Sequence, residues 1–461
     1  MAGPLFKMRS RVALLMLADI VCLAAVWSFV VWGYRAAGFG HYKYGAEFYL
    51  QLWPAAIAYL AINCMFRLYH GNILYPASPL SPVEELRRIV GSSLITHFGV
   101  VAYLALAYQT TEHYSRAVIV ISGVLVSALA VPVRDLFRWL AAKAGIGRIP
   151  VVLAGSGAAM EDAMSALDGD SYSGFSVVRA FGDGEVRDIV PESRRLGVRI
   201  LVSCQDERIL RAEFAAYGTW FTHVEYVPAT HVFPVAGART VSLNGVGALE
   251  MVNQRRMRAL RVEKWILDKF LALVAFVVLL PFFAVVPILV KLTSRGPVFY
   301  RQSRLGKKGR PIKVWKFRSM YVDADERLQA ILDSDPARRA EWEANFKLAD
   351  DPRVTPLGKF LRKTSIDEFP QLFNVFSGDM ALVGPRPIVE KEVERYGSAY
   401  STFASVEPGI TGLWQASGRS STDYAQRVAL DTYYVLNWSP WLDIWIMMKT
   451  VGAVLFMRGA C

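Results

Sequence analysis

The chain has 461 residues, of which 53% are hydrophobic, and its formal net charge is +12. Soluble domains are usually less apolar, so this composition argues against a wholly soluble protein, while the positive charge suits anionic lipid, nucleotide phosphates or nucleic acid as partners. The four cysteines (Cys22, Cys64, Cys204 and Cys461) have no metal-ligand spacing, which argues against a cysteine-based metal site or a disulfide framework.

The first 140 residues predict four transmembrane helices, because stretches of about 20 apolar residues cross the hydrocarbon core of a membrane. The apolar stretches occupy residues 12–33, 48–66, 89–108 and 117–133. The first one follows Lys7, Arg9 and Arg11 and is too long for a signal peptide, so we interpret it as a retained anchor. The distribution of basic residues predicts that both ends of this bundle are cytoplasmic.

One acidic residue, Asp19, lies inside the first apolar stretch. A carboxylate is costly in lipid, so its side chain is expected to face another helix or water. A polar contact within the bundle and a catalytic role are both compatible with this position.

Residues 149–250 predict a soluble, Rossmann-like α/β domain. A buried strand at 149–154 is followed by Gly155-Ser156-Gly157 and a helical pattern at 158–167, and residues 177–181 and 199–203 resemble further parallel strands. The dinucleotide fingerprint is incomplete, because Met160 occupies the third glycine position. A structural or regulatory domain and a nucleotide-binding domain therefore both remain open.

Residues 270–290 form a further apolar stretch, with Pro281 at its centre. Basic residues flank it on both sides, and translocating the second basic cluster would oppose the positive-inside rule. We therefore predict a re-entrant helix over residues 265–291, broken at Pro281, that enters and leaves on the cytoplasmic face. The alternative is an ordinary fifth transmembrane helix.

The basic stretch after residue 291 could bind nucleic acid, but it directly follows a membrane segment. Phosphates at a membrane surface are the better partner, and part of the charge could simply attract anionic lipid. Beyond it, Asp367 and Glu368 are adjacent carboxylates, and no His follows His231. Chemistry in this part would therefore use carboxylates, Arg or Lys and a metal, although an adjacent Asp-Glu pair alone is usually a solvated pair.

The part from about residue 261 to the end contains five ordered motifs: YRQSRLG at 300–306, KFRSM at 316–320, LRKTSIDE at 361–368, GPRP at 384–387 and PGITGLWQ at 408–415. With these motifs it resembles the bacterial sugar transferases, the polyprenyl-phosphate hexose-1-phosphate transferases. The four spans and the Rossmann-like domain are similar to the large form of that family. The family breaks its re-entrant helix at a Ser-Pro step, whereas Leu280 precedes Pro281 in this chain.

This resemblance implies an enzyme that transfers hexose-1-phosphate from a UDP-sugar to undecaprenyl phosphate and releases UMP. It would be a multi-pass protein of the bacterial inner membrane, initiating a cell-surface polysaccharide on the cytoplasmic face, with galactose favoured over glucose as the sugar. The partners would be UDP-hexose, undecaprenyl phosphate and membrane lipid, without nucleic acid, and the large form is compatible with a homodimer.

The resemblance also implies roles for residues. Asp367 matches the nucleophile of a two-step covalent mechanism, and Glu368 matches its partner in an Asp-Glu dyad that works with Mg²⁺. The candidate residues for binding substrate phosphates are Arg362, Arg386, Lys316, Arg318 and Arg301.

Two other functions compete with this one. A non-catalytic membrane scaffold or regulator could sense nucleotide through the Gly155-Ser156-Gly157 turn, and it would not need Asp367. A glycosyltransferase that makes sugar–sugar bonds would use an Asp-x-Asp metal site, a spacing found at Asp323 and Asp325, within a charged helical stretch.

Overall fold

The structure is a computed structural model. It describes residues 4–38, 52–69, 81–108, 115–145, 148–167, 174–227, 239–243, 246–250, 258–335, 338–339, 351–417 and 424–455. The chain divides into two compact units, Met1–Phe233 and Pro234–Cys461. The three domains expected from the sequence (1–140, 149–250 and 261–461) remain a prediction.

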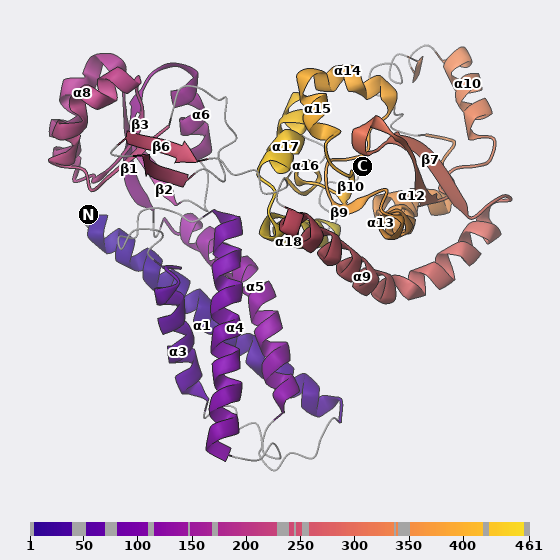
Figure 1. The fold of residues 1–461 in the computed structure, drawn as a ribbon, viewed down its shortest axis with the longest axis horizontal. Coiled ribbons are helices and arrows are strands. Elements are labelled where there is room, and N and C mark those ends of the chain that lie inside the picture. Colours follow the sequence, from indigo (N-terminus) through magenta and orange to yellow (C-terminus); the bar gives the residue numbers. More distant parts are fainter. Residues whose placement is uncertain are drawn as a thin grey trace. The chain divides into compact units, whose positions relative to one another are not determined.

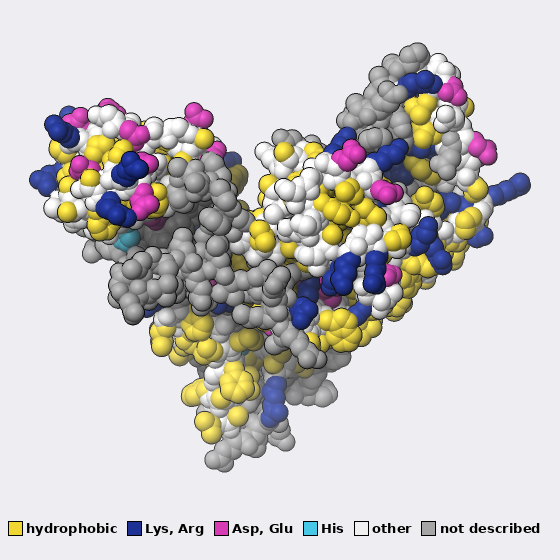
Figure 2. Space-filling view, turned by 45° about the horizontal axis from the view of Figure 1, so that its top comes forward, with side chains coloured by type: hydrophobic (Ala, Val, Ile, Leu, Met, Phe, Trp, Pro, Cys, Tyr) yellow, Lys and Arg dark blue, Asp and Glu magenta, His cyan; other side chains and the backbone are white. Residues whose placement is uncertain are grey.

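Long helices form the beginning of the first unit (Figure 1). They are α1 (Pro4–Ala36), α3 (Trp53–Met65), α4 (Pro82–Tyr108) and α5 (Arg116–Lys143). Among them α1, α4 and α5 are long and apolar enough to cross a membrane, and Figure 2 shows apolar side chains over the described surface of this part. The 13 residues of α3 extend only about 20 Å, so the described helix is shorter than the predicted span 48–66, whose residues 48–51 lie outside the described part.

A buried network of charges joins these helices. Asp19 is fully buried and accepts hydrogen bonds from Arg134, from Nε to Oδ1 at 2.7 Å and from Nη2 to Oδ2 at 2.5 Å. Asp19 also accepts hydrogen bonds from Tyr69 (2.6 Å) and Asn63 (2.9 Å), and Arg134 forms an ion pair of 2.8 Å with Glu85. The prediction that Asp19 faces another helix is confirmed, because its charge is compensated by α5.

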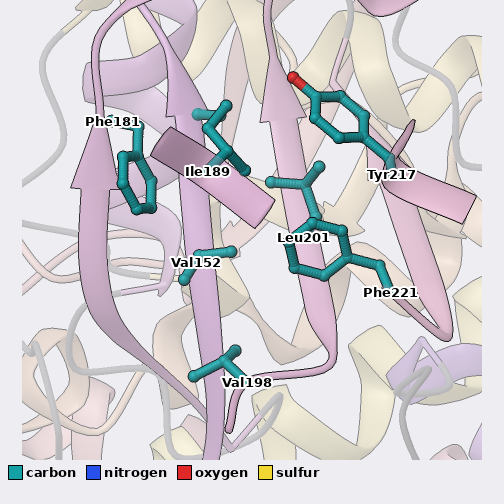
Figure 3. Close-up of a cluster of buried hydrophobic side chains, with 8 residues drawn as sticks. Val152, Phe181, Ile189, Val198, Leu201, Tyr217 and Phe221 are labelled. Atoms are coloured by element: carbon teal, nitrogen blue, oxygen red, sulfur yellow. The ribbon is translucent and has the colours of Figure 1, made fainter. Parts of the chain in front are cut away.

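The rest of the first unit holds a four-stranded parallel sheet in the order β2-β1-β3-β4. Its strands are β1 (Ile149–Gly155), β2 (Phe175–Phe181), β3 (Ile200–Cys204) and β4 (His223–Tyr226), and its helices are α6 (Gly157–Leu167), α7 (Ile189–Leu196) and α8 (Glu207–Gly218), with the 3₁₀ turn η2 (Asp183–Asp188). Val152 packs in a cluster with Ile189 of α7 and Tyr217 of α8 (Figure 3), whereas the next residue, Leu153, packs against α6. Helices therefore cover both faces of the sheet.

The predicted glycine turn lies at the end of β1. Gly155 has a φ of +143°, and a side chain there would lie 2.7 Å from the backbone of Cys204, which explains the need for glycine. β1, β2, β3 and α6 fall where the sequence predicts them. Assignment of the region to the Rossmann-like fold remains a prediction.

The second unit is built around one long helix, α9 (Arg258–Thr293). Its strands are β5 (Arg239–Leu243), β6 (Val246–Glu250), β7 (Phe299–Leu305), β8 (Pro311–Phe317), β9 (Ala381–Val383) and β10 (Gly409–Thr411). Its other α-helices are α10 (Ala324–Ser334), α12 (Pro356–Lys363), α13 (Leu372–Ser377), α14 (Val393–Tyr396), α15 (Tyr400–Phe403), α16 (Leu413–Ser417), α17 (Tyr424–Leu436) and α18 (Pro440–Leu455). Short 3₁₀ turns are η4 (Lys307–Gly309), η5 (Ile366–Gln371), η6 (Glu390–Glu392) and η7 (Gly397–Ala399).

Helix α9 is bent but continuous (Figure 1). Pro281 and Pro287 lie inside it, so the predicted break at Pro281 is corrected to a bend. A proline removes one backbone hydrogen bond and bends a helix, while the bonds on either side of it hold an apolar helix together. The re-entrant path itself remains a prediction.

Both halves of α9 contact the same globular body. Near its beginning, Lys264 Nζ lies 2.8 Å from Asp443 of α18. Further along, Phe276 and Phe283 both pack against Phe373 of α13. The outward side chains of α9 are exposed and apolar, and Figure 2 shows apolar and basic side chains together on this unit. The helix is anchored along its length while one apolar face stays uncovered.

We expect Arg134→Met to lower the free energy of unfolding by about 3 kcal/mol or more, because it leaves the buried Asp19 carboxylate without its cation, whereas Glu85 keeps its ion pair with Arg138. Thermal unfolding of the purified full chain in detergent measures this. Arg87→Met is the control, since that side chain is half exposed and pairs with Glu84 on the surface. Equal unfolding temperatures for Arg134→Met and the wild type would contradict a stabilising role for the network.

Candidate functional site

The adjacent carboxylates Asp367 and Glu368 lie in the short helical turn η5, between α12 and α13. Ser365 before it has a φ of +57°, a conformation uncommon outside glycine, and this residue turns the chain after α12. Ile366 then packs in an apolar cluster with Val290 of α9. The carboxylates are therefore fixed beside the C-terminal part of the long apolar helix α9.

Lys316 of β8 is the nearest cation to both carboxylates. Its Nζ atom lies 2.7 Å from Glu368 Oε1 and 4.0 Å from Asp367 Oδ2. Asp367 is only 7% exposed, so its interaction with Lys316 takes place in a poorly hydrated environment. The structure thus brings three of the predicted site residues together.

Arg362 is the second cation near Asp367, close enough to favour the ionised carboxylate electrostatically. Its Nε donates a hydrogen bond of 2.9 Å to Ser319 Oγ, which fixes the position of the guanidinium. Within the described part of the chain its other N–H groups have no hydrogen-bond partner, so they can contact a phosphate, which Arg binds in a bidentate manner.

Burial raises the pKa of Asp367 to about 6, and the charge of Glu368 adds to this effect. Lys316 and Arg362 act in the opposite direction but compensate the buried charge only in part. Above pH 6 the site therefore contains a carboxylate that is ionised and poorly solvated, which is the state of a reactive nucleophile.

The site fits a Mg²⁺ ion held jointly with substrate. Among the described residues no three His, Cys, Asp or Glu side chains come together as a metal site. Mg²⁺ needs no such cage, because it commonly binds one or two carboxylates and completes its shell with waters and phosphate oxygens. Asp367 and Glu368 supply this pair of carboxylates. Lys316 and Arg362 compensate the negative charge of Asp367 only in part, so binding of a further cation is favoured.

Arg318 and Arg301 have other surroundings. Arg318 is buried and donates from Nη2 to the carbonyl oxygen (2.7 Å) and the hydroxyl (2.9 Å) of Ser294, just after α9. Arg301 lies over the ring of Trp315 at 3.8 Å. The structure gives both arginines contacts away from the dyad, and their role in binding substrate stays a prediction.

Arg386 lies in another cluster, over the ring of Trp414 at 5.9 Å. Arg304 of β7 and Arg427 of α17 carry further positive charge there. The sequence did not single out these two as site residues. Arg304 lies inside the 300–306 motif and could have been found from it, whereas no motif marks Arg427.

Of the Asp-x-Asp pair at residues 323–325, the side chain of Asp325 lies outside the described part, whereas that of Asp323 is described. Asp323 accepts a hydrogen bond of 2.9 Å from Arg327, one turn later in an exposed helix. This is an ordinary surface pair near a helix N-terminus.

Comparisons with known proteins agree with the sequence motifs. Residues 259–457 match the family described as bacterial sugar transferase. The undecaprenyl-phosphate galactose phosphotransferase of Salmonella typhimurium is 36% identical over 376 residues, which cover 77% of this chain and 79% of that protein.

Two further relatives are similar to smaller parts of the chain. The exopolysaccharide production protein ExoY of Sinorhizobium fredii is 47% identical over 199 residues, covering 43% of this chain and 88% of that protein. The UDP-glucose:undecaprenyl-phosphate glucose-1-phosphate transferase of Klebsiella pneumoniae is 35% identical over 295 residues, covering 61% and 60%.

Asp367→Asn is expected to stabilise the folded protein at pH 8 by about 2 to 3 kcal/mol, because it removes a buried charge. Because burial raises the pKa of Asp367, the wild-type protein is more stable while this carboxyl is protonated. It loses that stability as the pH rises through about 6. The advantage of the variant should therefore disappear below about pH 4, near the pKa of an exposed Asp. Unfolding midpoints in detergent across this pH range measure it.

The control is Asp333→Asn, which changes an exposed carboxylate and should show no such pH dependence. A constant difference between Asp367→Asn and the wild type from pH 4 to pH 8 would contradict the buried-charge explanation.

Proposed function

The chain belongs to the bacterial sugar transferase family, and from this premise we propose that it transfers a hexose-1-phosphate from a UDP-sugar to undecaprenyl phosphate. The products would be UMP and undecaprenyl-diphosphate-hexose, the first membrane-bound intermediate of a polysaccharide such as an exopolysaccharide. The observation that carries this proposal is the buried Asp367, next to Glu368 and Lys316, beside the apolar helix α9.

The reaction would proceed in two displacements at one phosphorus atom. A carboxylate oxygen of Asp367 attacks the sugar-bearing phosphorus, and the bond from that phosphorus to the oxygen bridging the two phosphates breaks. UMP leaves with the electron pair of the broken bond, and an aspartyl-phosphosugar remains. A phosphate oxygen of the lipid then attacks the same phosphorus, and the Asp367 carboxylate is released unchanged.

Two separate steps reduce electrostatic repulsion, because the nucleotide diphosphate and the lipid phosphate are both anions. Lys316 and Arg362 would neutralise the sugar phosphate while Asp367 approaches it, since phosphoryl transfer depends mainly on positioning and charge neutralisation. Glu368, held by Lys316 at 2.7 Å, would orient that lysine. Asp367 and Glu368 would hold Mg²⁺, which would supply further charge neutralisation when bound.

We propose that α9 is a re-entrant helix in the inner membrane, with the site on the cytoplasmic face. Its contacts support this path, because Lys264 near its beginning and Val290 near its end both pack against the same globular body. A straight spanning helix would carry its two ends to opposite sides of a layer about 30 Å thick.

We propose galactose rather than glucose as the sugar. The support is the similarity to the galactose phosphotransferase of Salmonella typhimurium, which extends over more of the chain than the similarity to the glucose-1-phosphate transferase of Klebsiella pneumoniae. The two hexoses differ at one hydroxyl group, so direct comparison of the two donors is needed.

The transfer itself is tested by UMP release from UDP-galactose and UDP-glucose, with purified full-length protein, undecaprenyl phosphate and Mg²⁺. We expect release from UDP-galactose, reduced about a thousandfold or more by Asp367→Asn because the nucleophile is removed. Asp379→Asn, an exposed carboxylate after α13, is the matched control and should retain activity. Full activity of Asp367→Asn would exclude the covalent aspartate, and no release from either donor would favour the scaffold function.

The path of α9 is tested by labelling single cysteines in a background with the four native cysteines replaced by serine. Glu207→Cys in α8 and Arg310→Cys after β7 place exposed thiols before and after α9. A re-entrant helix predicts that a membrane-impermeant maleimide labels both thiols from the cytoplasmic side only. Labelling of the two positions from opposite sides would show that α9 spans the membrane.

A further inference from the structure

A second concentration of positive charge lies at the far end of β7. Leu305 at this end donates a backbone hydrogen bond of 2.8 Å to Ile388, which brings the 384–387 turn with Arg386 beside Arg304. Burial, followed by the like charges of Arg386 and Arg427, lowers the pKa of Arg304. Arg386 and Arg427 both lie over the ring of Trp414, at 5.9 and 5.0 Å, and both are close enough to Arg304 to repel its charge.

This repulsion is only partly compensated among the described residues. Arg427 pairs with Glu392 at 3.3 Å, but its Nε and Nη2 atoms are buried without a hydrogen-bond partner. In the described part of the chain, neither the Arg304 nor the Arg386 side chain makes a hydrogen bond or an ion pair. Asp431 is 1% exposed, and burial raises its pKa to about 7, so it is a weak counter-charge at neutral pH. Buried unpaired donors beside uncompensated cations are the features of an anion-binding site.

The cluster lies on the same side of the β7–β8 hairpin as the dyad. Lys316 pairs with Tyr300 in the antiparallel register, so their side chains share one face, and every second residue of β7 after Tyr300 shares it too. Arg304 is the second of these, about 13 Å along the strand from Tyr300. Arg301 belongs to the opposite face, where it lies over Trp315.

The dyad end of this face packs on the C-terminal part of α9 through Ile366 and Val290. The Arg304 end adjoins the 384–387 turn. A UDP-sugar carries two linked phosphates, so a donor whose sugar phosphate lies at Asp367 needs a second cationic site for its nucleotide phosphate. The single phosphate of the lipid has no such need.

We propose that Arg304, Arg386 and Arg427 form the binding site for the nucleotide phosphate of the UDP-sugar, which is the phosphate that leaves with UMP. This inference rests on the proposed transfer reaction. Lys and Arg side chains reach several ångströms from their backbones, so Lys316 and Arg304 can bracket a diphosphate from its two ends. The arginines then neutralise the charge that develops on the departing phosphate, while the sugar phosphate stays at Asp367.

The test measures UMP binding to the full-length protein in detergent, together with KM values for UDP-galactose and for undecaprenyl phosphate. We expect Arg304→Gln and Arg386→Gln each to raise the Kd for UMP and the KM for UDP-galactose roughly tenfold or more, which is the loss of one charge-assisted contact. The KM for undecaprenyl phosphate should not change. Arg310→Gln is the control, because it removes an equal but exposed charge from the turn that joins β7 to β8.

Arg427 contributes to packing as well as charge, so Arg427→Lys is the variant for this position. This variant keeps the positive charge but loses the planar guanidinium group. We expect it to weaken UMP binding with an unchanged unfolding temperature. An unchanged Kd for UMP in all three variants overturns the inference. So does a rise confined to the KM for undecaprenyl phosphate, which would assign the cluster to the acceptor lipid.

These outcomes separate this inference from the proposed reaction. Sugar-phosphate transfer with normal UMP binding in the arginine variants overturns the nucleotide site and leaves the reaction intact. UMP binding that depends on Arg304 and Arg386, in a protein that transfers no sugar phosphate, supports the site and overturns the reaction.

Discussion

The attachment of one apolar helix to one globular body at both ends is the constraint on which the second unit depends. Lys264 near the beginning of α9 and Val290 near its end are both fixed, and the bend between them leaves an apolar face without protein contacts. The cluster that holds the end of α9 also holds Ile366, directly before the dyad. The position of the carboxylates thus follows from the packing of the helix, and the site lies close to the exposed apolar face of α9.

The two ends of the β7–β8 hairpin differ in charge. Asp367 is buried beside Lys316 at one end, where partial compensation leaves a reactive carboxylate. At the other end, Arg304 and its neighbours have excess positive charge and unpaired donors. Residues on the reverse face, such as Arg301, stack on aromatic rings. The alternation of a β-strand therefore decides which basic residues share the face of the hairpin that carries Lys316, although all lie in one basic stretch of sequence.

The sequence predicted the features that depend on local pattern. The strands around Gly155, the apolar helices and the dyad with Lys316 and Arg362 follow from periodicity, composition and motif order. Motif membership could not separate Arg318, which anchors the end of α9, from Lys316, because their roles depend on the direction of each side chain. Arg427 could not be found at all, since only tertiary packing brings α17 to β7. Pro281 lies inside a continuous helix, so the predicted break there is wrong.

The buried pair of Asp19 and Arg134 has a consequence for how the protein is made. The two residues are separated by 115 positions, and ribosomes add about 5 to 20 residues each second. Helix α1 therefore emerges roughly ten seconds before α5 supplies its cation. During this interval the carboxylate of Asp19 lacks the guanidinium that makes its burial tolerable. Burial of Asp19 within the bundle is therefore complete only after α5 has packed against α1.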